Sequence, residues 1–339
     1  MDACPSSKLI YEICVMNAAP LLVSFDSIDK YLEALPEKHR TAHSAALSDL
    51  FSRGIPPITS AYCLAILFGY SLEFIYAMTK RPDKFYRVFS IKNGKKTRRI
   101  QAPKVALKVI QKWFGAHLSN NLTFHPHVYG FVKGRSFVDA AKHHIGARWV
   151  LAVDIDNFFP SISKERVLLS LIAQGYSNDA SKLISDLCCL NDSLAQGSPA
   201  SPVLSNLCMQ SIDDSLIKLS EKYKVTVTRY ADDITFSGIG EFDEGLKRDL
   251  QELIKSSGFQ LNDDKTYFAD STTGKRLKVH GLLVKEDSVR LTKGYRNKIR
   301  LYKHLQKSGR ISEDDYHRIN GHINFADFID SMSGIKDAI

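Results

Sequence analysis

The chain has 339 residues, of which 44% are hydrophobic and 24% are charged, so it can bury a large core in two or three structural units. Its formal net charge of +9 fits a polyanionic partner. The six cysteines form no Cys-x-x-Cys pair, which argues against a zinc site and fits reduced thiols in a cytoplasmic protein. No apolar run approaches about 18 residues, which argues against a membrane span or a signal peptide.

Residues 1–85 are expected to be helical. The apolar run 61–68 is followed by Gly69, a residue typical of helix ends, and Ser71 is placed to cap the helix that follows. Apolar side chains at helical spacing usually form a core, so this segment is predicted to contribute packing.

Short strands are predicted from residue 85 onward. Residues 85–91 alternate between apolar and polar side chains, Asn93-Gly94 is a strong hairpin signal, and residues 95–103 supply the second strand. Between Lys92 and Lys112 there are eight basic residues and no acidic one. A run of charge is usually a solvated face; here, interleaved apolar residues anchor it on the hairpin and on the helix after it.

The continuous apolar run 149–153 ends in Asp154 and predicts a buried strand. Asp156 follows two residues later. It is either a ligand of a metal ion or the N-cap of a helix that begins near Ser163, and the cap is favoured. Two amphipathic helices are expected between residues 163 and 190.

A second acidic site lies at Asp232-Asp233, between β-branched and aromatic residues that predict a hairpin. For an Asp-Asp pair alone, a solvated turn is the commoner outcome. Asp154 changes this expectation because it also ends a buried strand, so the two sites can share divalent cations. Mg²⁺ prefers such oxygen ligands, and two ions about 3.5–4 Å apart can clamp the attacking and leaving oxygens of a phosphoryl displacement.

The stretch from Arg290 to Arg310 also contains eight basic residues and no acidic one. Apolar residues at helical spacing predict a core face, and cations lie between them on a face suited to a phosphate backbone. The expected core residues are Tyr295, Ile299 and Tyr302, and the expected RNA-binding residues are Lys298, Arg300 and Lys303.

Three motifs together resemble the palm of a reverse transcriptase, most of all the bacterial retron and group II intron branch. They are Asp154-Ile155-Asp156-Asn157-Phe158-Phe159, Gln196-Gly197-Ser198-Pro199 and Tyr230-Ala231-Asp232-Asp233, in that order. The resemblance runs from about Tyr86 to Phe325. It implies an α+β right-hand polymerase fold, divided into a helical N-terminal segment (1–85), fingers (86–148), a palm with an antiparallel sheet (149–284, with inserted finger helices at about 163–195) and a small helical thumb (285–339).

By this resemblance, the carboxylates of Asp154, Asp232 and Asp233 hold two Mg²⁺ ions, together with the backbone carbonyl of Ile155. Lys265 corresponds to a lysine near the pyrophosphate leaving group, where it can supply charge or a proton. An ordinary surface lysine is the alternative for this position.

The resemblance also assigns substrate contacts. Arg99 is the candidate phosphate ligand, because its planar fork matches phosphate oxygens. Phe159 lies where related polymerases carry an aromatic that clashes with a ribose 2′-OH, and core packing is the alternative. Gln196 and Gly197 are expected to hold the nascent base pair, and Tyr230 to pack beside the primer terminus.

Lys133 and Arg135, in a second basic turn of the expected fingers, are weaker candidates for a phosphate contact.

The activity implied is RNA-directed DNA synthesis from dNTPs on a small structured non-coding RNA, through a DNA/RNA hybrid, in antiphage defence, with an accessory effector protein as a further partner. Two motifs depart from the retron pattern: residues 140–144 lack the Asn of Asn-Ala-x-x-His, and Val279-His280-Gly281 replaces Val-Thr-Gly. These departures predict a divergent retron enzyme or a related defence lineage. The alternatives are a catalytically silent RNA-binding module and a group II intron-related enzyme.

Overall fold

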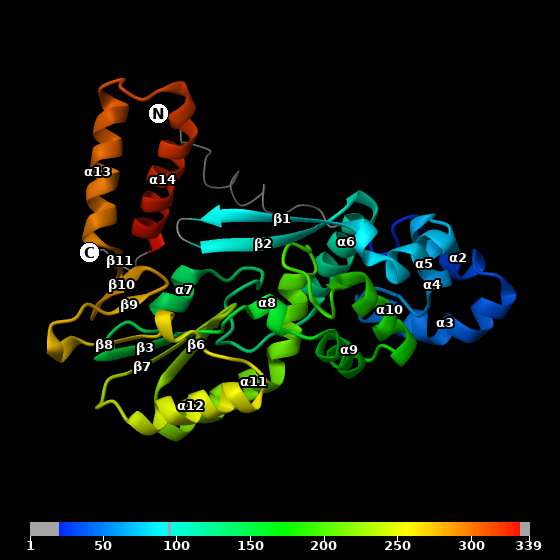
Figure 1. Ribbon diagram of the computed structural model, residues 1–339, viewed down its shortest axis with the longest axis horizontal. Helices are drawn as coiled ribbons and strands as arrows, with labels where there is room; N and C mark the ends of the chain where they lie inside the picture. Colours follow the sequence, from blue (N-terminus) through cyan, green and yellow to red (C-terminus); the bar gives the residue numbers. More distant parts are fainter. Residues whose placement is uncertain (1–19, 94–95, 333–339) are drawn as a thin grey trace. The chain divides into compact units, whose positions relative to one another are not determined.

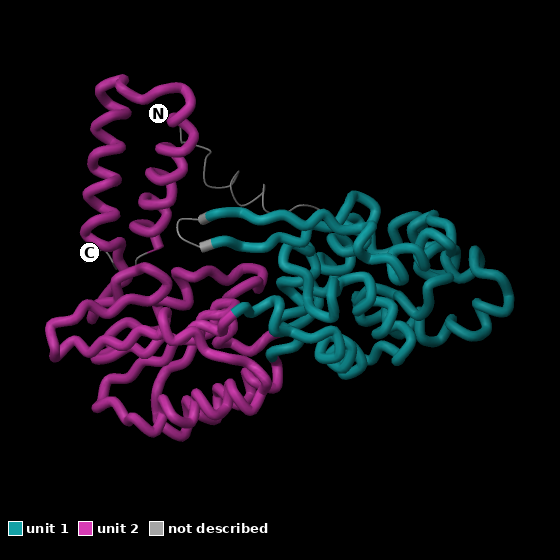
Figure 2. Tube along the Cα trace, viewed as in Figure 1, with its two compact units in different colours: residues 1–123, 157–209 teal, residues 124–156, 210–339 magenta. Residues whose placement is uncertain are grey.

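The computed structural model describes residues 20–93 and 96–332. The chain divides into two compact units (Figures 1 and 2): unit 1 comprises residues 1–123 and 157–209, and unit 2 comprises residues 124–156 and 210–339. Helix α11 (Ser201–Tyr223) begins in unit 1 and ends in unit 2.

Unit 1 is mainly helical. Its helices are α2 (Ile28–Glu33), α3 (Glu37–Ser52), α4 (Ala61–Phe68), α5 (Leu72–Lys80), η1 (Pro82–Phe85), α6 (Val105–Asn121), α8 (Phe158–Ser161), α9 (Lys164–Ala173) and α10 (Asn178–Cys188). The predicted boundary between α4 and α5 is confirmed, because Gly69 ends α4 at a φ of 65° and the Ser71 hydroxyl accepts a hydrogen bond from the Phe74 amide. Leu64, Leu67 and Ile75 are buried in this core.

Two small antiparallel ribbons complete unit 1. Strands β1 (Tyr86–Asn93) and β2 (Lys96–Pro103) pair over their whole length, as the alternating pattern predicted; Gly94 of the expected turn lies outside the described residues. Strands β4 (Cys189–Leu190) and β5 (Ser193–Leu194) form a short hairpin after α10.

Unit 2 is built on a four-stranded sheet with the order β6-β7-β3-β8. Its strands are β3 (Trp149–Asp154), β6 (Thr226–Tyr230), β7 (Asp233–Gly238) and β8 (Tyr267–Asp270). The central strand β3 runs antiparallel to both β7 and β8, and Val150, Ile234 and Phe236 are fully buried. This register places the end of β3 beside the start of β7.

Shorter elements connect and cover this sheet. They are α7 (Phe137–Lys142), α12 (Glu244–Ser256), η2 (Asp263–Lys265) and η3 (Ser271–Thr273). Helix α12 is amphipathic, because Leu246, Leu250 and Ile254 are buried on one of its faces.

A second, three-stranded sheet has the order β11-β10-β9 and consists of β9 (Lys278–Val279), β10 (Leu282–Val284) and β11 (Val289–Leu291). Residues 279–284 do not form one continuous strand. His280 and Gly281 have φ values of 48° and 81°, so they form a two-residue turn between β9 and β10. Both central residues of such a hairpin turn need a positive φ, and Gly281 provides one without steric cost.

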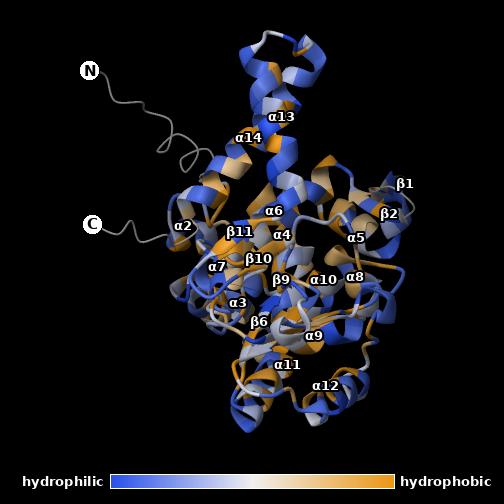
Figure 3. Cartoon of the chain, turned by 90° about the vertical axis from the view of Figure 1, so that its left-hand side faces the viewer, coloured by the Kyte–Doolittle hydropathy of each residue, from blue (hydrophilic) through white to orange (hydrophobic). Residues whose placement is uncertain are grey.

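Helices α13 (Lys293–Lys307) and α14 (Glu313–Met332) end unit 2 as a packed pair. The predicted core face of α13 is confirmed, because Ile299 and Tyr302 are buried against Ile319 and Ile323 of α14. The outer turns of both helices are largely hydrophilic (Figure 3).

The cysteines of the described chain, Cys63, Cys188, Cys189 and Cys208, are free and buried, as expected. Cys4 and Cys14 lie outside the described residues. Within the described ranges, no single helix combines the length and apolar character needed to cross a membrane. Helices α4 and α5 meet that test only as a pair, and they are bent by 119°.

Candidate active site

The tip of the β6–β7 hairpin carries two of the predicted carboxylates. Tyr230 pairs with Asp233, and Ala231 and Asp232 form the turn between them. Ala231 has a φ of 57°, a conformation that is sparsely populated for residues other than glycine. The surroundings must therefore hold this turn in place.

Asp154 lies on the neighbouring strand at the same level. Its Cα partner in the sheet is Asp233, and the next amide along β3, that of Ile155, donates to the Asp232 carbonyl at 3.0 Å. Asp154 is only 5% exposed, and one of its carboxylate oxygens contacts the ammonium group of Lys265. The structure thus brings together three carboxylates and a lysine that are far apart in the sequence.

This concentration of negative charge alters the pKa of Asp232. Burial, followed by repulsion from Asp154 and Asp233, raises the pKa of the Asp232 carboxyl to about 6. Lys265 acts in the opposite direction and offsets part of the increase. A bound cation would relieve the same repulsion.

Asp233 has a second neighbour in the turn between β9 and β10. The His280 Nδ1 atom lies 3.7 Å from the Asp233 Oδ2 atom, and the His280 side chain is only 6% exposed. Its ring also packs against Tyr230, with ring centroids 5.3 Å apart. His280 therefore contacts both residues that flank the Ala231–Asp232 turn.

A buried ion pair supports this turn from behind. Arg229, which is fully buried, donates from Nε and Nη2 to the two carboxylate oxygens of Asp213, at 2.6 Å each. Its Nη1 atom donates to the Ala231 carbonyl at 3.0 Å. Burial alone would raise the pKa of Asp213, but the Arg229 guanidinium and the His127 ring hold it below its usual range. Arg229 thereby links the helix α11 to the strained turn.

The segment before α7 closes the other side of the turn. The Arg229 amide donates to the His127 carbonyl and the Tyr129 amide donates to the Arg229 carbonyl, both at 2.8 Å. At Gly130, an added Cβ would lie 2.2 Å from the Ala231 nitrogen, so only glycine fits.

Comparison with known protein families decides the assignment. The model of the family described as reverse transcriptase (RNA-dependent DNA polymerase) matches residues 91–290, which is more than half of the chain. The chain belongs to the reverse transcriptase family. It is of the retron type, and the right-hand polymerase fold and the RNA-directed DNA polymerase activity predicted from the sequence are confirmed by this family.

The chain is also similar to individual proteins. The chain is 29% identical to the retron Ec86 reverse transcriptase of Escherichia coli over 284 residues, covering 83% of this chain and 88% of that one. It is 31% identical to the retron Mx65 reverse transcriptase of Myxococcus xanthus, covering 61% of this chain and 53% of that one. Among solved structures, telomerase from Candida albicans in complex with a fragment of telomeric RNA has a TM-score of 0.44 and 12% identity, over 65% of this chain and 50% of that one.

Reverse transcriptases use divalent metal ions, and this chain has oxygen ligands of the type that such ions prefer. Asp154, Asp232 and Asp233 supply carboxylate oxygens, and burial together with repulsion from the other two carboxylates raises the pKa of Asp232. In the described part of the chain, no three His, Cys, Asp or Glu side chains gather around one point as a metal site. The carboxylates of Asp154 and Asp233 are instead turned to Lys265 and His280.

Several predicted substrate contacts of the reverse transcriptase lie in unit 1. The Gln101 amide on β2 donates to the Gln196 carbonyl at 2.7 Å, and the Gln196 amide donates back to the Gln101 side chain at 3.2 Å. Gly197 has a φ of 129°, and an added Cβ would meet the Gln101 carbonyl at 3.0 Å. The Gln196–Gly197 loop is thus fastened to the strand that carries the exposed Arg99.

Phe159 lies in the short helix α8 and is half-buried, with its ring 5.5 Å from that of Phe158. This position is compatible with both the substrate contact and the packing that the sequence allowed.

The three predicted RNA-binding residues are exposed on α13, and two of them have partners on α14. Lys303 pairs with Asp327 at 2.8 Å, and the Lys298 ammonium lies 3.4 Å from His322. Arg300 contacts Asn297 on its own helix at 3.4 Å. Some of the basic side chains of α13 are therefore already in contact with α14.

Two sequence-based expectations were wrong. Asp156 caps no helix: Ser163 is the N-cap of α9, and Asp156 instead lies 3.4 Å from the Asn262 side chain. Arg135 is not free for a phosphate, because its guanidinium donates to the backbone carbonyls of His125 and Val128 at 2.6 Å each.

Sequence reasoning missed the contacts of Arg229 and His280 beside the Ala231–Asp232 turn. For Arg229 there was a signal, an arginine between the apolar and β-branched residues of a predicted central strand, which must find an acidic partner when buried. For His280, the sequence showed that it replaces the Thr of the retron Val-Thr-Gly motif, but nothing in the sequence placed it beside Tyr230 and Asp233.

Proposed function

We propose that this reverse transcriptase copies a small, structured non-coding RNA into DNA by two-metal-ion nucleotidyl transfer. The observation that carries the proposal is the convergence of Asp154, Asp232 and Asp233 at the adjoining ends of β3 and β7. A silent RNA-binding module has no physical need for three neighbouring carboxylates, one of which has its pKa raised to about 6 by burial and by repulsion from the other two.

In the proposed reaction, the primer 3′-OH, or an RNA 2′-OH for the first addition, attacks the α-phosphate of a dNTP. A new phosphodiester bond forms, the bond to the β-phosphate oxygen breaks, and pyrophosphate leaves. Two Mg²⁺ ions, when bound, would lower the pKa of the attacking hydroxyl and stabilise the leaving pyrophosphate. Asp154, Asp232, Asp233 and the Ile155 carbonyl would hold them.

The remaining residues act on the nucleotide and the primer. Lys265, freed from Asp154, would supply positive charge or a proton to the leaving group. Arg99 would bind the triphosphate and Gln196–Gly197 the nascent base pair, while Tyr230 packs beside the primer terminus. Phe159 would exclude the ribose 2′-OH.

The proposed partners are the non-coding RNA, dNTPs and the DNA/RNA hybrid product, with an accessory effector protein in cytoplasmic antiphage defence. Support for a dedicated RNA comes from the relatives named as retron reverse transcriptases and from the net charge of +9.

Two measurements test the proposal. Primer extension on an RNA template should require Mg²⁺ and deoxyribonucleotides and should stop when the metal is chelated. Sequencing of the nucleic acid that copurifies with the protein should return one structured small RNA. Absence of extension would contradict the polymerase assignment, and recovery of random cellular RNA would contradict the dedicated template.

A further inference from the structure

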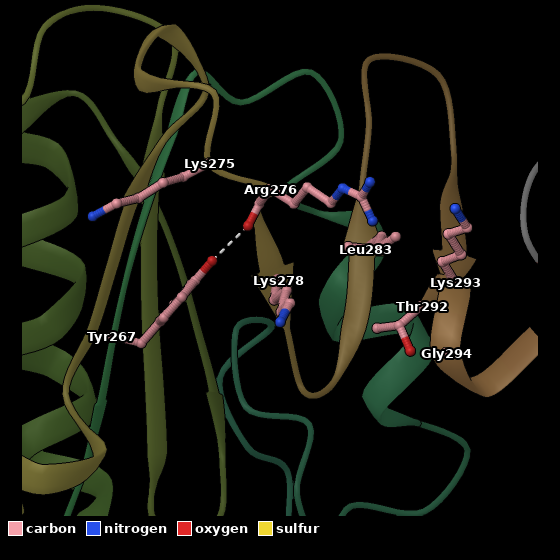
Figure 4. A pocket seen from close by; sticks show the side chains of 8 residues that line it. All are labelled: Tyr267, Lys275, Arg276, Lys278, Leu283, Thr292, Lys293 and Gly294. Carbon is pink, nitrogen blue, oxygen red and sulfur yellow. Dashed lines mark hydrogen bonds between the residues drawn. The ribbon is translucent and has the colours of Figure 1, made fainter.

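Unit 2 contains a cavity of about 370 Å³ at the N-terminal end of α13, and its lining does not include the residues of the Ala231–Asp232 turn. Its walls come from β8, the segment before β9, the small sheet and the first turn of α13 (Figure 4). The lining residues are Tyr267, Lys275, Arg276, Lys278, Leu283, Thr292, Lys293 and Gly294. Four of these eight carry a positive charge, and none carries a negative one.

The alternation of the chain before the turn at His280 explains why cations face this cavity. Leu277 and Val279 are buried in the core of unit 2, so Arg276 and Lys278 point to the opposite, exposed face. Lys278 pairs with Leu283 across the small sheet, which adds an apolar floor. The pairing of β9 with β10 and the burial of Leu277 and Val279 therefore explain why basic side chains line the cavity.

The position of Arg276 is fixed by a hydrogen bond. The Tyr267 hydroxyl donates to the Arg276 carbonyl at 2.5 Å and ties the incoming segment to the edge strand β8 (Figure 4). In the same view, the Arg276 side chain extends past Leu283 toward the side of Lys293, whereas Lys275 points away from it.

The cations of the cavity differ from those further along α13. Lys298 and Lys303 contact His322 and Asp327. Across the described ranges 20–93 and 96–332, neither Arg276, Lys278 nor Lys293 takes part in an ion pair. Three cations around one hollow repel one another unless an anion lies between them.

We propose that this cavity binds a backbone phosphate of a nucleic acid strand, with Arg276 and Lys293 as its main ligands and Lys278 as a third. The planar guanidinium of Arg276 can donate two parallel hydrogen bonds to the free oxygens of a phosphodiester. The open first turn of α13, where a Cβ at Gly294 would meet no atom within 4 Å, leaves room for the sugar–phosphate chain to approach.

This inference rests on the proposed function, because it assumes that the enzyme holds a nucleic acid. It assigns the cavity to anchoring the strand and gives it no part in the chemistry. The phosphate can belong to the RNA or to the DNA product, since both share the phosphodiester group.

The test compares binding of a fluorescent oligouridylate and an oligothymidylate of equal length by anisotropy over a range of salt concentrations. For Arg276→Ala with Lys293→Ala, affinity at low salt should fall about three- to tenfold, and the log–log salt slope should drop by roughly 0.7 for each phosphate that the variant no longer neutralises. Turnover in primer extension at saturating primer–template should not change. The charge-conserving pair Arg276→Lys and Lys293→Arg should keep most of the affinity.

Lys255→Ala is the control for loss of one charge and is compared with Arg276→Ala and Lys293→Ala taken singly, since it removes an exposed positive charge from α12. A loss confined to the cavity variant, for RNA, for DNA or for both, supports the site and identifies the strand. Unchanged binding of both oligonucleotides, or an equal loss in the Lys255→Ala variant, would overturn it. Failure of the wild-type protein to extend a primer would contradict the proposed function separately, because binding is measured without catalysis.

Discussion

The Ala231–Asp232 turn with its neighbours and the basic face of α13 hold their charges in opposite ways. At the turn, Asp154 is 5% exposed and Arg229 is fully buried, and their partners are fixed by short contacts. On α13, Lys298 and Lys303 are exposed. Lys303 pairs with Asp327, and Lys298 lies near His322 and over the rings of Tyr295 and Tyr302. Charges in the first region depend on one another and on exact positions, whereas those in the second act nearly independently and are screened by salt. Substitutions should therefore cause large, coupled losses in the first and small, additive ones in the second.

The largest effect is expected from Asp232→Asn. DNA synthesis should fall by roughly a thousandfold or more, because a carboxylate proposed to hold the metal ions is lost. Removal of a carboxylate whose pKa is raised to about 6 also relieves repulsion, so the metal-free melting temperature should hold or increase. Primer extension and thermal denaturation measure both quantities. Activity equal to that of the wild type would contradict the catalytic role of Asp232.

The next effect comes from breaking the pair behind the turn. Asp213→Asn leaves the buried Arg229 without its counter-charge, which should cost about 3–5 kcal/mol of unfolding free energy and also lower the rate of the folded fraction. Chemical denaturation at fixed salt measures the loss. The double variant Arg229→Leu with Asp213→Leu should regain part of the stability, and a strictly additive result would argue against coupling.

The raised pKa of Asp232 gives a pH dependence of defined sign. A carboxyl whose folded pKa of about 6 exceeds its ordinary value of 3.8 binds its proton more tightly in the folded state. Metal-free stability should therefore increase as pH falls through 6, by about 1 kcal/mol after allowance for solvent screening. Activity should fall over the same range, because protonated carboxyls bind cations poorly. In Asp232→Asn, the stability profile should lose this step.

An intermediate effect is expected at Phe159 in unit 1. Phe159→Ala should raise incorporation of ribonucleotides relative to deoxyribonucleotides, because the side chain proposed to meet the 2′-OH is removed. Competition between the two nucleotide classes in primer extension gives the ratio. An unchanged ratio in a folded variant would leave Phe159 as a packing residue beside Phe158.

The smallest effect is expected on α13. Lys298→Ala with Lys303→Ala should weaken RNA binding a few-fold for every sequence and reduce the log–log salt slope by roughly 0.7–0.9 for each phosphate that is no longer neutralised. The reduction at Lys303 should be the smaller one, because its ammonium is already paired with Asp327. Equal weakening by Lys255→Ala on α12 would show that only net charge matters.

The contrast between the two regions also explains what the sequence could predict. An apolar run placed Asp154 at the end of a buried strand, and a hairpin pattern placed Asp232 and Asp233 at its turn. The pairing of β3 with β7 then brings them together. The core face of α13 followed from its spacing in the same way. Local pattern suffices where one period determines which face is buried.

Contacts between distant segments could not be predicted. Asp213 lies on a helix and Arg229 on a strand, and nothing in either segment identifies the other. The sequence was equally compatible with a solvated Lys265 side chain, and only the structure shows that η2 places it against Asp154. Asp156 had the residue type of a helix cap, but the chain used Ser163 for that purpose. In each case the local sequence allowed more than one conformation or partner, and tertiary packing determined which one formed.

Gly130 has a consequence for how mutational maps of this enzyme should be interpreted. Any side chain at this position would collide with the Ala231 backbone, yet glycine contributes no functional group and lies about a hundred residues earlier in the chain. A saturation screen scored by cDNA yield alone would rank Gly130 with the aspartates. A parallel screen for RNA binding in cells would place with the wild type a Gly130 variant that folds but has a displaced Ala231–Asp232 turn. The two screens together would distinguish a residue that only leaves room for the turn from one that takes part in the reaction.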